Sequence, residues 1–261
     1  MTDRTAAFHA LHRSGRPLLL PNAWDHASAA ALAARGHPAV GTTSLGVAAA
    51  AGRPDGTGAT RDETLDLARR LRDLPVLLTV DIEDGFGADP AAVAGYVGEL
   101  AALGVVGVNL EDGRPDGTLA PVDEVAAKIA AIRAAVPDVF VNARTDAWWL
   151  GTSDPLPAAL ERAAAYRAAG ADGLFAPAAP DDTLELLVAQ VGLPLNVLHR
   201  PGGPDPAALG RLGVARVSTG SLLFRAALGA ALHLADAVRA GRDAGLPPAP
   251  DYAWVQGLAA G

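Results

Sequence analysis

The chain has 261 residues, half of them hydrophobic, which is enough for one large α/β domain with a sizeable core. Its formal net charge of −8 argues against a nucleic-acid-binding protein, because no basic surface is implied. The absence of cysteine excludes disulfides, thiolate metal sites and cysteine nucleophiles, and the lack of a membrane-spanning apolar run predicts a cytoplasmic protein without a membrane partner.

Short apolar runs alternate with Ala-rich helical patterns along the whole chain. This alternation predicts strands at 18–20, 39–41, 76–80, 106–110, 140–142, 173–175, 195–198 and 215–218. It predicts helices at 27–35, 61–72, 90–103, 122–135, 156–169, 181–191, 205–212 and 222–240. Several helices begin at cap residues, such as Asp89-Pro90, and end near glycine, such as Gly104.

Such strand–helix units, with no linker between them, predict a single domain over residues 1–261. We expect a (β/α)8 TIM-type barrel, since an open doubly wound sheet usually has fewer strands. A proline-rich stretch, Leu246–Pro250, ends the last helical pattern and introduces a C-terminal helical extension at about 241–261. We expect this extension to cover the barrel floor or to reach a neighbouring subunit.

The fourth unit contains the most informative motif, Asp81-Ile82-Glu83-Asp84-Gly85-Phe86-Gly87, directly after an apolar run. Carboxylates at the C-terminal end of a strand are where such a barrel places its chemistry. Asp81 and Glu83 lie two residues apart and would point the same way on a continuing strand, as ligands for Mg2+. The alternative is a polar strand-to-helix loop with a helix cap.

Polar residues follow most of the other predicted strands as well, and we expect them to converge on one face. Thr43, Ser44 and Gly46 offer hydroxyl and N–H groups for a carboxylate or oxyanion, or form an ordinary turn. The planar fork of Arg144 suits a substrate anion, or an ion pair with Asp146 or Glu111. The remaining candidates are Asp55, Glu111 and His199 as catalytic residues, and Trp24 and Asn196 as substrate-binding wall residues.

Lys128 is the only lysine of the chain and falls within a predicted helix, well past a strand end. We predict a solvated helix residue there. A Schiff-base mechanism needs a lysine in the site, so a metal is favoured as the electron sink.

In their order along the chain, these motifs resemble the isocitrate lyase / phosphoenolpyruvate mutase superfamily. The match covers Pro21–Asp25, Thr42–Ala48, Pro54–Gly56, Asp81–Gly87, Gly107–Asp112 and Asn142–Asp146. The resemblance implies a Mg2+-dependent barrel whose carboxylic acid substrates pass through an enolate. It also implies a homo-dimer or homo-tetramer that exchanges a C-terminal helix.

The resemblance implies a role for individual residues of this sequence that match a family motif. Asp81 would be the main metal carboxylate, with Glu83 and Asp55 holding the metal through water and Glu111 completing an acidic ring. Thr43, Ser44 and Gly46 would cradle the substrate carboxylate or enolate oxygen, and Arg144 would bind the far anionic group.

The loop 113–121 departs from the family pattern. Lyase members carry a Cys-containing loop there and mutase members a Lys and an Asn-Ser pair, whereas this loop contains no Cys, Lys or His. The interpretation is a Mg2+-dependent carbon–carbon lyase for a small 2-oxo or 2-hydroxy acid. Alternatives are a hydrolase or mutase for oxaloacetate-like or phosphonopyruvate-like acids, and a barrel that binds a metal and an acid without turnover.

Overall fold

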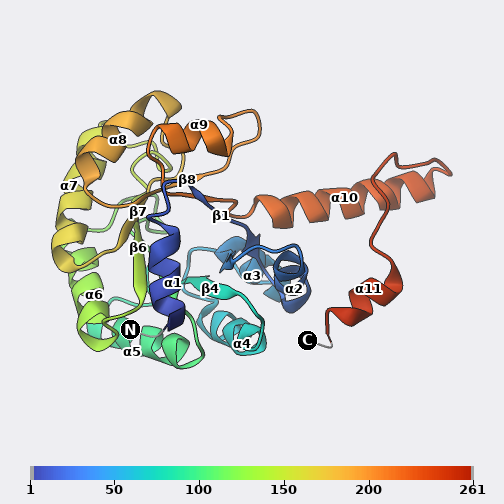
Figure 1. Cartoon of the computed structure of the whole chain (residues 1–261), viewed down its shortest axis with the longest axis horizontal. Coiled ribbons are helices and arrows are strands. Elements are labelled where there is room, and N and C mark those ends of the chain that lie inside the picture. The colour runs from blue at the N-terminus through green and yellow to red at the C-terminus, as the bar shows by residue number, and fades with distance from the viewer. Residues whose placement is uncertain (1–2, 260–261) are drawn as a thin grey trace.

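A computed structural model describes residues 3–259, and its centre is a ring of parallel strands (Figure 1). The strands are β1 (Leu18–Leu20), β2 (Asn22–Ala23), β3 (Ala39–Thr42), β4 (Leu77–Asp81), β5 (Gly107–Glu111), β6 (Phe140–Arg144), β7 (Gly173–Phe175), β8 (Leu195–Leu198) and β9 (Arg216–Ser218). Their order is β1-β9-β8-β7-β6-β5-β4-β3-β2. Because β1 and β2 are consecutive in the chain, the sheet closes on itself, which confirms the predicted barrel.

The first barrel strand is divided at Pro21, which has no N–H to donate to a ladder. On one side of Pro21, β1 pairs with β9, and on the other β2 pairs with β3. Asn22 joins the two edges. Its Oδ1 accepts from the N–H groups of Thr219 (3.0 Å) and Gly220 (2.9 Å), and its Nδ2 donates to the carbonyl of Thr42 (2.7 Å).

Helices surround the barrel and match most of the predicted segments. They are α1 (Asp3–Leu11), α2 (His26–Ala34), α3 (Ser44–Ala51), α4 (Arg61–Leu71), α5 (Pro90–Ala102), α6 (Val122–Ala135), α7 (Pro155–Ala169), α8 (Leu184–Val191), α9 (Pro206–Arg211), α10 (Leu222–Arg239) and α11 (Tyr252–Gly257). Helices α1 and α3 and the short strand β2 were not predicted, whereas α11 falls within the predicted C-terminal helical extension. Within residues 3–259, no helix has the length and apolarity needed to span a membrane.

Alternation along the strands separates two environments. Outward side chains such as Leu78, Val80 and Val108 join the large core between strands and helices. Inward side chains become polar toward the C-terminal ends, as in the step from Phe140 to Asn142 along β6. The apolar helical layer therefore stabilises a barrel whose upper interior is available for chemistry.

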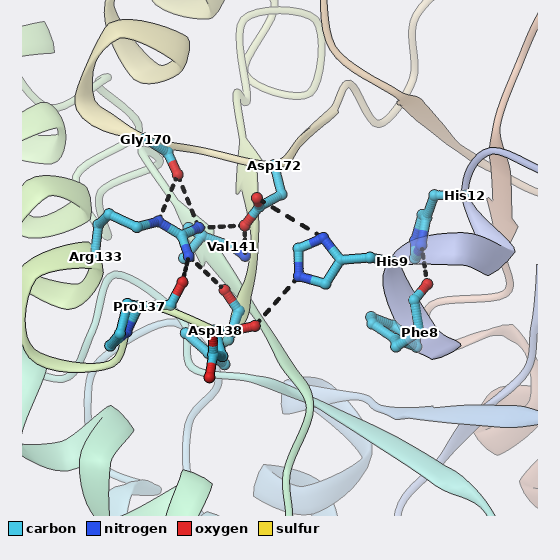
Figure 2. Close-up of polar contacts among 10 residues, drawn as sticks. Phe8, His9, His12, Arg133, Pro137, Asp138, Val141, Gly170 and Asp172 are labelled. Atoms are coloured by element: carbon cyan, nitrogen blue, oxygen red, sulfur yellow. Dashed lines mark hydrogen bonds and ion pairs between the residues drawn. The ribbon is translucent and has the colours of Figure 1, made fainter. Parts of the chain in front are cut away.

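Helix α1 covers the floor of the barrel. Phe8 is fully buried with Leu18, Leu20 and Phe140, and His12 stacks on the Phe140 ring at 4.1 Å. Figure 2 shows His9 of the same helix beside the carbonyl of Asp138 (3.2 Å). We expected the C-terminal extension either to cover the barrel floor or to reach a neighbouring subunit. The first expectation is not met, because α1 covers the floor.

Burial of His12 predicts an acid-sensitive fold. Burial and the nearby Arg216 lower the pKa of His12 to about 3, whereas the unfolded chain would titrate near 6.5. Between pH 6.5 and about 3, His12 is protonated in the unfolded chain but not in the folded protein. The free energy of unfolding therefore falls as the pH drops through this range. Between pH 7.5 and 5.0 this one group should cost about 2 kcal/mol. Urea unfolding at both pH values should show that the free energy of unfolding falls by about 2 kcal/mol less in His12→Gln than in wild type. An equal fall in the two proteins would contradict this prediction.

Beyond its first turn, helix α10 leaves the barrel instead of packing against it (Figure 1). Ala237 is its only buried residue, and Leu228, Leu232 and Val238 are between 51% and 70% exposed. The outward face of β1 is left uncovered, and Leu19 there is 44% exposed. The chain thus exposes apolar surface both on a projecting helix and on the barrel wall.

Candidate active site

A cavity of about 260 Å³ opens at the C-terminal ends of the strands. The predicted residues that line it are Thr43, Ser44, Asp55, Asp81, Glu111 and Arg144. These come from β4, β5 and β6 and from the segments after β3, so the structure brings together residues spread over about 100 positions of sequence. This is the face on which barrel enzymes place their active sites.

Asp81 is the last residue of β4, and its backbone is fixed by a hydrogen bond from its N–H to Oγ1 of Thr42 (2.9 Å). Its Oδ1 accepts from the N–H of Glu83 (3.2 Å). Burial raises the pKa of Asp81, and the charge of Asp55 adds to this, whereas Arg144 and the N–H groups of Glu83 and Ser44 oppose it. Burial therefore disfavours the charged form of this carboxylate, and a cation bound beside it would stabilise that form.

Arg144 lies between two carboxylates. Its Nη1 is 2.6 Å from Oε2 of Glu111, and its Nε and Nη2 bind Asp146 in a fork, at 2.7 and 3.0 Å. Burial nevertheless raises the pKa of Glu111 well above its usual value, with Asp81 and Asp146 adding to the effect. Both ion pairs that the sequence analysis gave as the alternative role of Arg144 are present.

Asp112 connects the ion pairs of Arg144 to helix α7, on the side away from the cavity. Alternation places Glu111 toward the cavity and Asp112 toward α7, where it is fully buried. Its Oδ2 accepts from Nη1 of Arg162 (3.0 Å) and from the hydroxyl of Tyr166 (2.8 Å), and its Oδ1 accepts from the N–H of Asp146 (2.8 Å). The cavity wall is therefore anchored to α7 by a buried network.

Glu83 does not line the cavity. β4 ends at Asp81, and Glu83 has a φ of +50°, so the strand alternation does not continue to it. Its carboxylate accepts from the hydroxyl of Thr60 (2.6 Å) and the N–H of Gly58 (2.8 Å). Glu83 thereby holds the loop 52–60, which carries Asp55 to the cavity; a metal role for it stays a prediction.

The unusual loop 113–121 forms one wall of the cavity through Gly113, Arg114 and Pro115. Gly113 bridges to Leu119, and Arg114 pairs with Glu124 of α6 at 2.6 Å. A side chain at Gly113 would overlap the carboxylate of Asp146. Glycine at position 113 therefore lets the loop pass close to the Asp146 carboxylate, which binds Arg144.

The other predicted site residues lie outside the cavity. Trp24 packs edge-on against Phe224 (5.5 Å between ring centroids), and Gly46 fits closely against Trp24. Asn196 is buried and accepts from Ser218 (3.1 Å), whereas His199 lines a separate small pocket near Arg200. The cavity is also lined by residues that were not predicted as site residues, namely Asn109, Ser218, Trp149 and Phe175.

Lys128 is not solvated, so that prediction was wrong. It is 2% exposed, donates to the carbonyl of Asp84 (2.9 Å) and lies near the carboxylate of Glu124 (3.7 Å). These acceptors offset part of the cost of burying a cation on the helix face. Lys128 does not line the cavity, which is consistent with a mechanism without a Schiff base.

The family is established by comparison with known proteins. A family model described as phosphoenolpyruvate phosphomutase matches residues 8–239. An uncharacterised protein of Mycobacterium tuberculosis is 46% identical over 251 residues, which cover 96% of this chain and 95% of that protein. The 2-methylisocitrate lyase of Salmonella typhimurium is 36% identical over 211 residues, which cover 73% of this chain and 69% of the enzyme.

A solved structure agrees with these relatives. The complex of phosphonopyruvate hydrolase with oxalate and Mg2+ superimposes with a TM-score of 0.83 at 28% identity, covering 98% of this chain and 95% of the hydrolase. The related proteins thus include a lyase and a hydrolase on the same fold. The chain belongs to the isocitrate lyase / phosphoenolpyruvate mutase superfamily.

Proposed function

We propose that the protein is a Mg2+-dependent lyase that cleaves a carbon–carbon bond in a small 2-oxo or 2-hydroxy carboxylic acid through an enolate-like intermediate. The observation that carries this proposal is the cavity itself, in which the Asp81 carboxylate lies beside the N-terminal turn of α3. A carboxylate that attracts a cation next to N–H groups that attract an anion suits an acid bound together with a metal.

The charges of the cavity fit a divalent cation. Asp55, Asp81, Glu111 and Asp146 line it, and Arg144 is the cation that pairs with two of them. Within residues 3–259 no cluster of three or more carboxylate or histidine side chains could hold a metal by itself. Mg2+ usually takes one or two carboxylates, keeps several waters and completes its shell with substrate oxygens. Asp81 would hold it directly, with Asp55 acting through water.

Each side chain then has a separate task. Bound Mg2+ would supply Lewis-acid stabilisation of negative charge on the substrate oxygens. The hydroxyls of Thr43 and Ser44 would orient the carboxylate together with the N–H of Leu45, because the first turn of α3 leaves that N–H without a helical partner. Arg144 would bind the far anionic group with the N–H groups that Glu111 and Asp146 do not use.

Besides Glu111, Asp116 in the loop 113–121 and His199 are candidates for the proton donor. Hydrogen bonds from Thr118 lower the pKa of the exposed Asp116, and His199 lies outside the cavity. Glu111 is in the cavity, and its pKa is raised by burial, so it retains a proton at higher pH than a free carboxyl. We propose that Glu111 returns the proton to the enolate carbon, the task for which the loop 113–121 offers no thiol.

Product analysis tests the proposal. The protein with Mg2+ would be incubated with a panel of 2-hydroxy and 2-oxo acids and their aldol adducts. Glyoxylate, or pyruvate released without phosphate, supports the lyase. Oxalate plus acetate, or phosphate, would instead support hydrolysis, which the similarity to phosphonopyruvate hydrolase keeps as the second candidate. Tight binding of acids without any turnover would support the non-catalytic alternative.

We further propose that the protein is a cytoplasmic homo-oligomer, at least a dimer, in which α10 packs against a second copy. Its exposed residues Leu228, Leu232 and Val238 and the uncovered Leu19 are the apolar surfaces to be buried. Leu228→Asp with Leu232→Asp should therefore convert the oligomer to monomers in sedimentation velocity. Arg239→Asp, on the same helix, is the charge control. A wild-type monomer would contradict the proposal.

A further inference from the structure

Arg216 is a buried cation one layer below the cavity. It lies two residues before Ser218 on β9, is 0% exposed, and forms no ion pair within residues 3–259. Its Nη2 donates to Oδ1 of Asn109 (3.1 Å), whereas Nε and Nη1 have no partner. Burial lowers its pKa to about 9, so it keeps its charge at neutral pH. An unpaired buried charge is costly, so packing alone does not account for this arginine.

The contact with Arg216 fixes the orientation of Asn109. A guanidinium has donors and no acceptor, so the amide oxygen of Asn109 must face it. The same oxygen also accepts from Nδ2 of Asn142 (2.9 Å). The bonds from Arg216 and from Asn142, the register partner of Asn109 on β6, therefore both use Oδ1, and the NH2 group of Asn109 is left with no hydrogen-bond partner among the described residues.

The free NH2 group belongs to a residue that lines the cavity. Asn109 is the register partner of Asp81 across β4 and β5, and it lies two residues before Glu111 on the same inward face. A neutral donor between two carboxylates suits a substrate oxygen that gains negative charge, because the donor attracts that oxygen without competing for the metal.

We propose that Asn109 donates a hydrogen bond from its amide to an oxygen of the bound carboxylic acid, and that Arg216 is the positioning residue that fixes Asn109 in this orientation. This inference deepens the proposed function and rests on it. Arg216 also places positive charge below the oxygen, in an interior where charges are weakly screened. Asn142 contributes the second donor that keeps the amide from turning over.

Calorimetry on the full-length protein tests the proposal, with Mg2+ alone and with oxalate in the presence of Mg2+. Arg216→Met should weaken oxalate binding at least about tenfold, the effect of one hydrogen bond to a charged ligand. Mg2+ binding should be unchanged or tighter, because a cation near Asp81 has been removed. Arg216→Lys, which keeps the charge and a donor, should restore most of the oxalate affinity. A parallel loss of both affinities in Arg216→Met would show a merely structural role and overturn the proposal.

If Arg216→Met does not fold, Asn109→Thr tests directly whether the Asn109 amide binds the carboxylic acid. Threonine suits a strand, its hydroxyl can accept from Arg216, and it adds no charge. It should weaken oxalate binding about tenfold and leave Mg2+ binding unchanged. Oxalate affinity within about twofold of wild type would overturn this inference alone. A wild-type protein that bound neither Mg2+ nor oxalate would overturn the proposed function and this inference with it.

Discussion

Replacing Asp81 with Asn should abolish the stabilisation that Mg2+ and oxalate together confer on the protein. A ligand at about 100 times its Kd adds about 2.7 kcal/mol to the free energy of unfolding. Asn keeps the shape of the side chain but removes the charge that would hold the metal, so thermal unfolding of the variant should show no shift with both ligands present. A full shift in Asp81→Asn would contradict the metal role.

Without ligands, the same variant should be at least as stable as wild type. Burial raises the pKa of Asp81, so the folded protein releases its proton at higher pH than the unfolded chain. The resulting penalty is absent below the unfolded pKa of about 3.8 and grows as pH rises above it. The stability gain of Asp81→Asn should therefore appear at pH 7 and vanish near pH 3. Asp84→Asn is the control, since that half-exposed carboxylate lies in the same turn.

Replacing Arg144 with Met should cost about 3–5 kcal/mol of stability, the loss expected when one partner of a buried ion pair is removed. Glu111 and Asp146 would be left as buried carboxylates without their cation. Their pKa values would rise further, so the loss should be large at pH 8 and shrink below their unfolded values, near pH 4. The same substitution should raise KM for an anionic substrate and lower kcat.

A second set of variants separates the stability effect from the binding effect. Adding Glu111→Gln and Asp146→Asn to Arg144→Met removes the unpaired charges and should recover most of the stability but none of the oxalate affinity. Arg53→Met, which breaks an exposed pair with Glu63, should cost less than about 1 kcal/mol. A cost this small for Arg144→Met, measured by urea unfolding, would show that its ion pairs contribute little.

Every barrel strand except the two-residue β2 was predictable, because their apolar runs are bounded by glycines and cap residues. Helix α3 was not, since Ser44–Ala51 is almost uniformly apolar and shows no polar face that would mark a helical period. For α1, burial of Phe8 against the barrel floor contributes stability that no local sequence pattern reveals. Tertiary packing decided both elements.

Convergence of the site was predictable from strand ends, but the direction of each side chain was not. Glu83 was assigned by alternation, which stops where β4 ends, so the side chain turns to Thr60. His199 lies one residue past β8 and points to a different pocket. Asn109 could have been included, because the same alternation that selected Glu111 also selects the residue two positions earlier.

The division of the first strand at Pro21 has a consequence for the order of folding. Most strands pair with a neighbour in sequence, but the bonds from Asn22 reach residues 197 and 198 positions away. Contacts between such distant residues form slowly, because a long segment of chain must be ordered before they are made. We therefore expect an open sheet to assemble first along the chain, and the ring to close last, when Asn22 meets the turn after β9.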